Sequence, residues 1–297
     1  MQNIAVRLKN GDVIVGDGGW GTMLMQRGLK HGEVPEMMNL SNPDILATIA
    51  DLYLDAGAEI ITTNTFGGSS LRLHLASLED KADEINRTGV EIIRNETAGR
   101  AYVSASVGPT GTLIAPYGKT TPDEVYLSFV NQIRELLAAG SDLICVETMT
   151  DLQEALLAIK AVRSLSAEIP IMATMTFDEK PRGFFTIMGV SIEKAALGLE
   201  AAGATIIGSN CGNGIEKMIK IARAFKDHTH LPIAIQANAG LPLMLDGQTT
   251  YPESPAFMAE KTVELLEIGV QIIGGCCGTT PEHIRAFRSV IDNFRSI

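Results

Sequence analysis

Cysteine and histidine are both scarce in this sequence of 297 residues, which contains four cysteines and five histidines. So few cysteines, without a secretory signal at the N-terminus, exclude the disulfide scaffold that small extracellular domains use. The histidines form no HxxxH or HExxH arrangement, so the usual pattern of a histidine metal site is missing as well. A metal bound by this chain is therefore expected to have sulfur ligands.

Positive charge is also in short supply, because 24 Lys and Arg stand against 35 Asp and Glu and the formal net charge is -11. Nucleic acids and anionic membranes both require a concentrated basic face on their protein partner. No apolar stretch approaches the roughly 18 uninterrupted residues of a membrane span. We therefore expect a cytoplasmic protein whose partner is a small molecule or another protein, with no nucleic acid or membrane involved.

A repeated unit runs through the whole chain. A short run rich in Val and Ile is followed by a turn containing Gly, Asn or Thr and then by a longer amphipathic pattern, and this order occurs eight times. Continuous apolar runs are typical of parallel strands that are covered on both faces. The predicted strands are residues 12–15, 59–62, 102–107, 143–146, 169–175, 205–207, 232–235 and 270–273.

The segments between these strands have the pattern of amphipathic helices. Several begin at Asn-Pro or Thr-Pro and several end at a glycine, which are common helix starts and stops. The predicted helices are residues 44–56, 82–94, 122–139, 152–164, 192–202, 215–225, 255–268 and 281–294. Eight such units predict an α/β fold, a single (β/α)8 TIM barrel over residues 1–297, in preference to a six-stranded doubly wound sheet.

Three cysteines follow two of the predicted strands. Cys211 comes after the sixth strand, and Cys276 and Cys277 come after the eighth. The active face of a TIM barrel lies past the strand ends, and alternate strands contribute to one layer, so these thiols can converge near the barrel axis. Three thiolates and one open position fit a tetrahedral catalytic zinc. The alternative is that Cys211 is a small buried residue and that Cys276 and Cys277 are a packed or redox-active pair.

Two acidic residues are placed at the same end of the barrel. Asp17 follows the first predicted strand, and Glu147 directly follows the fourth and is expected at the barrel rim. A buried pair of carboxylates there can bind a substrate ammonium. The alternative is a solvated loop acid or a helix N-cap. Asp178 and Glu179 lie beside basic residues in the loop after the fifth strand, where a solvated cluster is predicted instead.

Seven short stretches, all just past predicted strands, match one enzyme family. The chain resembles the homocysteine S-methyltransferase family over essentially its whole length, and is similar above all to the homocysteine-binding N-terminal module of cobalamin-dependent methionine synthase. The matching stretches are 17–22 (DGGWGT), 63–67 (TNTFG), 108–111 (GPTG), 147–155 (ETMTDLQEA), 210–211 (NC), 238–240 (NAG) and 274–283 (GGCCGTTPEH). The last of these, joined to a lone cysteine after the sixth strand, is a highly specific combination.

The resemblance implies an enzyme that methylates the thiol of homocysteine to give methionine, with another small thiol as the alternative acceptor. It implies that Cys211, Cys276 and Cys277 bind Zn2+ and that the sulfur of homocysteine takes the open position. It also implies that Glu147, together with Asp17, receives the amino group of the substrate.

Further substrate-binding residues are implied in the turns after the second, third and seventh strands. Main-chain amides near Gly108 to Gly111, or the turn that contains Thr63 and Asn64, are candidates for binding the substrate carboxylate. Asn238 is the remaining candidate, in the matching stretch 238–240.

The methyl donor is less clearly indicated. The family uses a methylated corrinoid on a separate module, S-methylmethionine or S-adenosylmethionine, or betaine. We favour a corrinoid protein acting in trans, because the match is nearest to the methionine synthase module and 297 residues leave no room for folate and cobalamin domains beside a barrel. The stretch 182–189 (RGFFTIMG) departs from the more polar sequence expected there, which bears on how the donor approaches.

Aromatic residues make up 5% of the sequence, and Trp20 is its single tryptophan. A cage for the quaternary ammonium of betaine needs several aromatic rings, so this composition favours an open mouth that admits a corrinoid. We expect the docking surface on the loops after strands one, five and seven, including Trp20, Phe184, Phe185 and residues 241–245. The alternatives are a betaine- or S-methylmethionine-dependent enzyme and a non-catalytic zinc or redox-sensing barrel.

Overall fold

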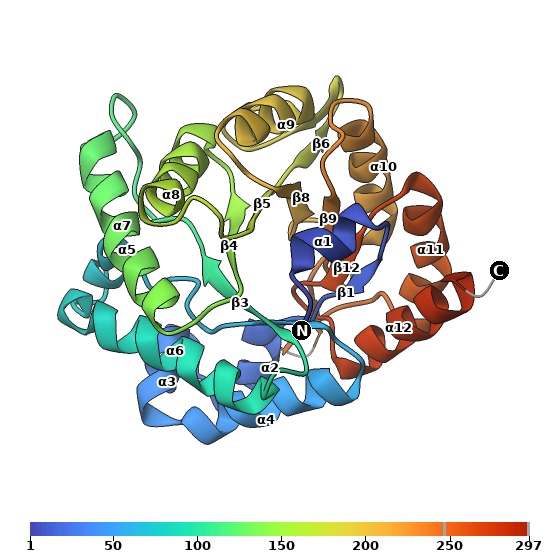
Figure 1. Ribbon diagram of the computed structural model, residues 1–297, viewed down its shortest axis with the longest axis horizontal. Coiled ribbons are helices and arrows are strands. Elements are labelled where there is room, and N and C mark those ends of the chain that lie inside the picture. The colour runs from blue at the N-terminus through green and yellow to red at the C-terminus, as the bar shows by residue number, and fades with distance from the viewer. Residues whose placement is uncertain (246–247, 296–297) are drawn as a thin grey trace.

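The computed structural model, which describes residues 1–245 and 248–295, contains a barrel of eight parallel strands inside a ring of helices (Figure 1). The barrel strands are β1 (Ile14–Val15), β2 (Ile60–Thr62), β3 (Tyr102–Val107), β4 (Leu143–Met149), β5 (Ile171–Met175), β8 (Ile206–Asn210), β9 (Ile233–Ala237) and β12 (Ile272–Gly275). They lie in the order β1-β12-β9-β8-β5-β4-β3-β2. A bridge between Gly16 and Ile60 joins β1 to β2 and closes the barrel.

One helix follows each barrel strand and packs on the outside of the barrel (Figure 1). These helices are α4 (Pro43–Asp55), α6 (Ala82–Thr97), α7 (Pro122–Ala138), α8 (Leu152–Leu165), α9 (Ile192–Ala201), α10 (Ile215–Lys226), α11 (Pro255–Ile268) and α12 (Pro281–Arg295). Helix α7 begins with a capping box between Thr121 and Glu124, which satisfies free amides of its first turn. In the described part of the chain no helix is both long and apolar enough to cross a membrane.

The predicted (β/α)8 barrel is confirmed. Each predicted strand overlaps one barrel strand and each predicted helix overlaps one outer helix. The alternative of a six-stranded doubly wound sheet is wrong, because the sheet has eight strands and closes on itself. Strand β4 continues past the predicted end at Val146 as far as Met149, so Glu147 lies within the last part of the strand.

The sequence patterns missed a short helix at the N-terminus, α1 (Ile4–Lys9), which closes one end of the barrel. The side chain of Asn3 caps it by accepting a hydrogen bond from the amide of Ala5. Ile4 and Leu8 join a buried cluster with residues of the barrel strands, among them Ile14 and Cys145. In Figure 1, α1 lies across the barrel strands in front of the viewer. Cys145 also packs in this cluster.

The side chains inside the barrel change from apolar to polar toward the strand ends. The apolar cluster contains Ile14, Ile60, Tyr102, Cys145, Met172, Ile206, Ala234 and Ile272. Because side chains alternate along a strand, the residues two positions further on face the same side. Those residues are Gly16, Thr62, Ser104, Glu147, Thr174, Gly208, Gln236 and Gly274. The open end of the barrel therefore has a polar floor with room above its glycines.

The loops at this open end contain several short elements that the sequence patterns did not predict. They are α2 (Trp20–Gln26), η1 (Pro35–Met37), α3 (Met38–Ser41), α5 (Ser70–His74), η2 (Glu79–Lys81) and the hairpins β6 (Asp178–Lys180) with β7 (Gly183–Phe185) and β10 (Leu243–Leu245) with β11 (Gln248–Thr250). Elements of three to seven residues are too short to show a clear hydrophobic period. Glu179 forms ion pairs with Lys217 and Lys220 near the surface, as expected of a solvated cluster.

Candidate metal centre and substrate cavity

The three thiols predicted as metal ligands converge at the open end of the barrel. The Sγ atoms of Cys211, Cys276 and Cys277 all lie within 4.8 Å of one another, and those of Cys211 and Cys277 are 3.9 Å apart. Sulfur ligands about 2.3 Å from a tetrahedral zinc ion lie about 3.8 Å from each other. The spacing of the thiols therefore fits three ligands of one zinc ion and leaves a fourth position for another ligand.

Main-chain contacts between neighbouring strand ends hold these cysteines. The amide of Cys211 donates to the carbonyl of Gln236 (3.2 Å), and the amide of Cys276 donates to the carbonyl of Ala237 (2.8 Å). Cys211 has a φ angle of 61°, in the left-handed region that residues other than glycine rarely adopt. Strained backbone of this kind persists where the surrounding structure holds it, and it is concentrated at functional sites.

The turn that contains Cys276 is fixed to the turn after β1. The hydroxyl of Thr279 donates to the carbonyl of Cys276 (2.7 Å) and accepts from the amide of Gly19 (3.0 Å). A Cβ atom on Gly19 would lie 2.6 Å from the carbonyl oxygen of Cys276, so this close approach requires glycine. The first and last strands of the barrel therefore position the cysteine turn together.

As free groups, the three thiols share their negative charge unequally. Hydrogen bonds from Cys276 and then from Cys277 lower the pKa of Cys211 well below its ordinary value. The same contacts with Cys211 raise the pKa values of Cys276 and Cys277. One thiolate is thus held by two thiols, and a divalent cation that replaced their protons would allow all three to ionise.

Asn238 lies against this cluster. Its side chain is buried and hydrogen-bonds to the sulfur of Cys211. Its carbonyl oxygen Oδ1 is also buried, and it has no hydrogen-bond partner among the described residues. A buried carbonyl oxygen without a partner calls for a donor or a cation. The three sulfur atoms are a donor set that fits zinc.

Tyr251 is a further neighbour of the thiols that the sequence patterns did not reveal. Its hydroxyl hydrogen-bonds to the sulfur of Cys277. Burial raises the pKa of Tyr251 to about 12, with a further contribution from the charges of Cys277 and Cys211. The tyrosine therefore stays protonated and donates to the sulfur.

A cavity of about 300 Å³ adjoins the thiols. Its walls contain the three cysteines and both predicted carboxylates, Asp17 and Glu147. The aromatic residues in these walls are Trp20 and Phe66. A volume of this size suits a small amino acid better than a cofactor.

Asp17 is fully buried in the wall of the cavity. Its carboxylate accepts hydrogen bonds from the indole of Trp20 (2.7 Å), the amide of Thr62 (2.7 Å) and the hydroxyl of Thr62 (2.9 Å). Burial raises the pKa of Asp17 to about 6, although these donors act in the opposite direction. The carboxylate is therefore held in a fixed orientation with part of its acceptor capacity still free.

Glu147 is held in a similar way on the strand β4. Its carboxylate accepts hydrogen bonds from the hydroxyl of Ser106 (2.5 Å) and from the side-chain amide of Asn210 (3.1 Å). Burial raises the pKa of Glu147 to about 7, and the charges of Asp17 and Cys211 raise it further. Asn210 directly precedes Cys211 in the chain. The residue that positions the Glu147 carboxylate is therefore the neighbour of a candidate metal ligand.

The other predicted substrate residues are largely engaged with the protein. Thr63 and Asn64 line the cavity, but the Thr63 hydroxyl contacts that of Thr65 (2.6 Å), and the Asn64 amide donates to the carbonyl of Pro35 (2.8 Å). Gly108 is not among the residues that line the cavity, and its amide donates to the carbonyl of Phe66 (2.9 Å). The proposal that the Gly108 amide binds the substrate carboxylate is therefore withdrawn, because a neighbouring turn already uses this donor.

Glu36 is a third carboxylate in the cavity wall, and no sequence motif indicated it. It lies on the short η1 helix, is buried, and accepts a hydrogen bond from the amide of Gly67 (2.6 Å). Burial raises its pKa, and the charge of Arg72 opposes this effect. The loop that carries Glu36 has no periodic pattern, so its path back over the barrel could not be predicted.

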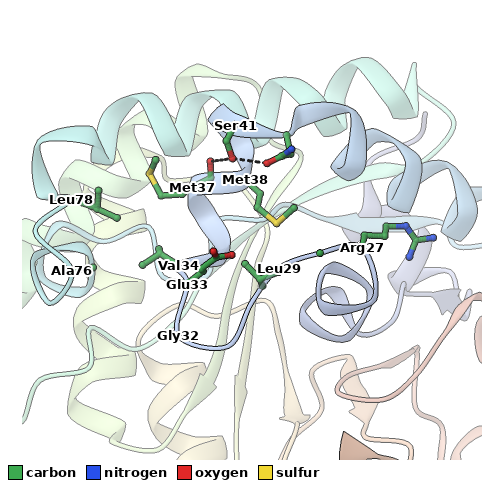
Figure 2. Close-up of a pocket in the computed structure, with 12 residues that line it drawn as sticks. Arg27, Leu29, Gly32, Glu33, Val34, Met37, Met38, Ser41, Ala76 and Leu78 are labelled. Carbon is green, nitrogen blue, oxygen red and sulfur yellow. Dashed lines mark hydrogen bonds between the residues drawn. The ribbon is translucent and has the colours of Figure 1, made fainter. Parts of the chain in front are cut away.

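A second hollow, of about 530 Å³, lies beside the loop after α2 (Figure 2). Apolar side chains such as Leu29, Met37 and Met38 line it. The hydroxyl of Ser41 lies within donating distance of the carbonyl of Met37 and the side-chain carbonyl of Asn42. None of the three clustered cysteines lines this hollow. We therefore place the functional site in the cavity beside the thiols.

Comparison with known proteins identifies the family. The model of the family described as homocysteine S-methyltransferase matches residues 14–291. The chain belongs to the homocysteine S-methyltransferase family. This result confirms the family expected from the sequence motifs, and the matched residues include both carboxylates and all three cysteines of the site.

Two curated relatives of this chain are mycobacterial methionine synthases. The protein of Mycobacterium leprae (strain TN) is 31% identical over 298 residues, which cover 94% of this chain and 24% of that protein. The protein of Mycobacterium tuberculosis (strain ATCC 25618 / H37Rv) is 32% identical over 302 residues, which cover 95% of this chain and 25% of that protein. The chain thus spans about a quarter of the length of these relatives.

Solved structures show the same fold. The homocysteine methyltransferase MmuM from Escherichia coli in its metallated form has a TM-score of 0.79 at 19% identity, covering 96% of this chain and 98% of that chain. Its oxidized form has a TM-score of 0.79 at 21% identity, covering 97% of this chain and 99% of that chain. At such low identity the likeness concerns the barrel itself.

Proposed function

We propose that this chain transfers a methyl group to the thiol of homocysteine and forms methionine, using a zinc ion bound by Cys211, Cys276 and Cys277. The observation that carries this proposal is the convergence of the three thiols beside a cavity that also contains Asp17 and Glu147. Sulfur ligands suit zinc, and buried carboxylates suit an ammonium group. One small molecule that has both a thiol and an ammonium group can satisfy both sets of residues.

Zinc, when bound, lowers the pKa of a thiol that coordinates it, so the substrate sulfur is available as a thiolate at neutral pH. The protein residues orient the substrate for the reaction. Glu147 and Asp17 hold the ammonium group, while Ser106, Asn210 and Thr62 keep the two carboxylates in place. The lone pair of the sulfur forms the new bond to the methyl carbon, and the donor keeps the electron pair of the bond that breaks.

We infer that the methyl donor is a methylcorrinoid carried by a protein that acts in trans. Support comes from the similarity to methionine synthases and from exposed apolar side chains on the loops that follow the barrel strands. Leu241 and Met244 in the loop after β9 are 53% and 68% exposed, and Ile187 in the loop after β5 is 76% exposed. Apolar side chains exposed in one region favour a protein partner. The side chain of Leu245 lies outside the described residues.

The walls of the cavity argue against betaine as the donor. A quaternary ammonium is usually held by several aromatic faces. Among the described residues, the aromatic side chains that line the cavity are those of Trp20 and Phe66. Phe184 and Phe185, which we expected at the donor surface, are only partly exposed on the hairpin strand β7.

The test is the amount of methionine formed from homocysteine under anaerobic conditions with each donor supplied in turn. The donors are free methylcobalamin, a methylated corrinoid protein, S-methylmethionine and betaine. We expect turnover with the two corrinoids and little or none with betaine. Brisk turnover with betaine and none with either corrinoid would overturn the donor, and no methionine with any of the four would overturn the proposed activity.

A further inference from the structure

Gln236 on β9 is a buried amide in the wall of the cavity, and the sequence analysis did not single it out as a site residue. Its side chain is 8% exposed and lines the cavity. The carbonyl oxygen Oε1 is fully buried and has no hydrogen-bond partner in the part of the chain that the structure describes. Leaving a buried polar atom unpaired costs about 1–3 kcal/mol, so a partner is expected from outside the protein.

Gln236 is paired in the sheet with two residues, and each of them lies close to one of the two carboxylate residues. On one side it pairs with Gly274, and a Cβ atom there would lie 3.4 Å from Cγ of Gln236 and 3.1 Å from the carbonyl oxygen of Asp17. On the other side it pairs with Asn210, whose side-chain amide donates to Glu147. The glycine leaves space over which the glutamine side chain extends. Gln236 therefore stands between the turn of Asp17 and the residue that holds Glu147.

An α-ammonium group has three N–H donors and needs three acceptors when it leaves water. A carboxylate has about four acceptor positions. Asp17 accepts three hydrogen bonds from the protein and Glu147 accepts two, so each retains capacity for a substrate N–H. The unpaired oxygen of Gln236 is available to accept the third N–H of the ammonium group. Because this oxygen is neutral, it adds no charge beside two acids and three thiols.

We propose that Oε1 of Gln236 accepts a hydrogen bond from the α-ammonium of the substrate and so selects an amino thiol over thiols that lack this group. The inference rests on the proposed function, since it assumes that the cavity binds homocysteine through Asp17 and Glu147. It adds a specificity residue on the strand between the two cysteine-bearing strand ends.

The test measures the affinity of the zinc-loaded protein for three thiols by titration calorimetry. They are homocysteine, 3-aminopropanethiol, which lacks the carboxylate, and 4-mercaptobutyrate, which lacks the ammonium. In Gln236→Met we expect about 10- to 100-fold weaker binding of the first two, and affinity for 4-mercaptobutyrate within about twofold of the original protein. Gln236→Glu keeps an acceptor and is expected to bind 3-aminopropanethiol at least as tightly.

Gln236→Asn sets the carbonyl back by one methylene group and is expected to give the same pattern as Gln236→Met, so it decides the question if the methionine variant does not fold. Ser209→Ala is the matched control, because the Ser209 hydroxyl is also buried without a partner among the described residues but does not line the cavity. It should leave all three affinities unchanged. Unchanged binding of both amino thiols, or equal losses for all three thiols, would overturn the role of Gln236. A parent protein that binds none of the thiols with zinc present would overturn the proposed function and this inference with it.

Discussion

The sulfur atoms of Cys211 and Cys277 lie 3.9 Å apart, although 66 positions separate the two residues in the chain. The closure of the barrel brings them together, because β8 and β12 are both neighbours of β9. We expect the purified protein to contain about one zinc ion per chain, since three thiolates make up a catalytic zinc site with one open position. Metal analysis by mass spectrometry measures this, and a protein without stoichiometric zinc would favour the redox-sensing alternative.

Removing one of these thiols should release the metal. Cys276→Ala and Cys211→Ser leave two sulfur ligands, so we expect zinc affinity to fall by about 100-fold or more in each. Cys145→Ala is the matched control, because Cys145 is buried in the apolar cluster below the cavity and should not affect zinc content. Full zinc retention in both of the first two variants would remove them from the ligand set.

Substitution of Glu147 should separate substrate binding from metal binding. In Glu147→Gln an uncharged amide replaces the buried carboxylate, and we expect homocysteine to bind about 10- to 100-fold more weakly with zinc retained. Glu154→Gln is a suitable control, since Glu154 is also a buried carboxylate but bonds to Thr110 away from the cavity. Calorimetry that showed equal homocysteine affinity for Glu147→Gln and the parent protein would exclude Glu147 from the substrate site.

The raised pKa of Glu147 predicts a pH dependence of substrate binding. Burial raises this pKa to about 7, so in the substrate-free cavity the group is neutral below that pH and cannot offset an ammonium. The ratio of homocysteine affinities between the parent protein and Glu147→Gln should rise by about tenfold per pH unit up to about 7 and then level off. Taking the ratio cancels the proton that the thiol releases in both proteins. A ratio that stayed constant from about pH 5.5 to 8.5 would contradict this account.

The exposed apolar residues after β9 allow a test of the donor surface. With Leu241→Glu and Met244→Glu combined, we expect slower methyl transfer from a methylated corrinoid protein and unchanged transfer from free methylcobalamin, because only the protein has to dock. Leu197→Glu on α9 is the control, since Leu197 is 56% exposed on the outer wall of the barrel. Equal rates with the corrinoid protein for all of these proteins would rule out this surface.

The barrel and its cysteines could be predicted because each depends on a strong local pattern. Apolar runs of fixed length mark the strands, and Cys211 stands directly after one of them. In a barrel the carboxyl ends of all strands lie at one face, so residues that directly follow strands in the sequence lie near one another in space. The same reasoning placed Asp17 and Glu147 in one cavity.

The residues that sequence reasoning missed depend on contacts between distant segments. Glu36 reaches the cavity because an irregular loop folds back over the barrel, and Tyr251 reaches Cys277 from the segment before α11. The amide of Gly108 was a candidate for binding the substrate carboxylate, but it donates a hydrogen bond to the carbonyl of Phe66 in the preceding turn. Loop paths and hydrogen-bond partners of this kind have no periodic signal in the chain.

The apolar side chains that fill the barrel below the cavity, together with Ile4 and Leu8 of α1, have a kinetic consequence. A cavity with a single mouth must admit the thiol and the methyl donor by the same route. If a large donor protein covers that mouth, the thiol has to enter first, and methionine can leave only after the donor protein has departed. With the proposed corrinoid protein as donor, the order of binding and release would be compulsory, and the rate of product loss would be linked to the lifetime of the docked complex.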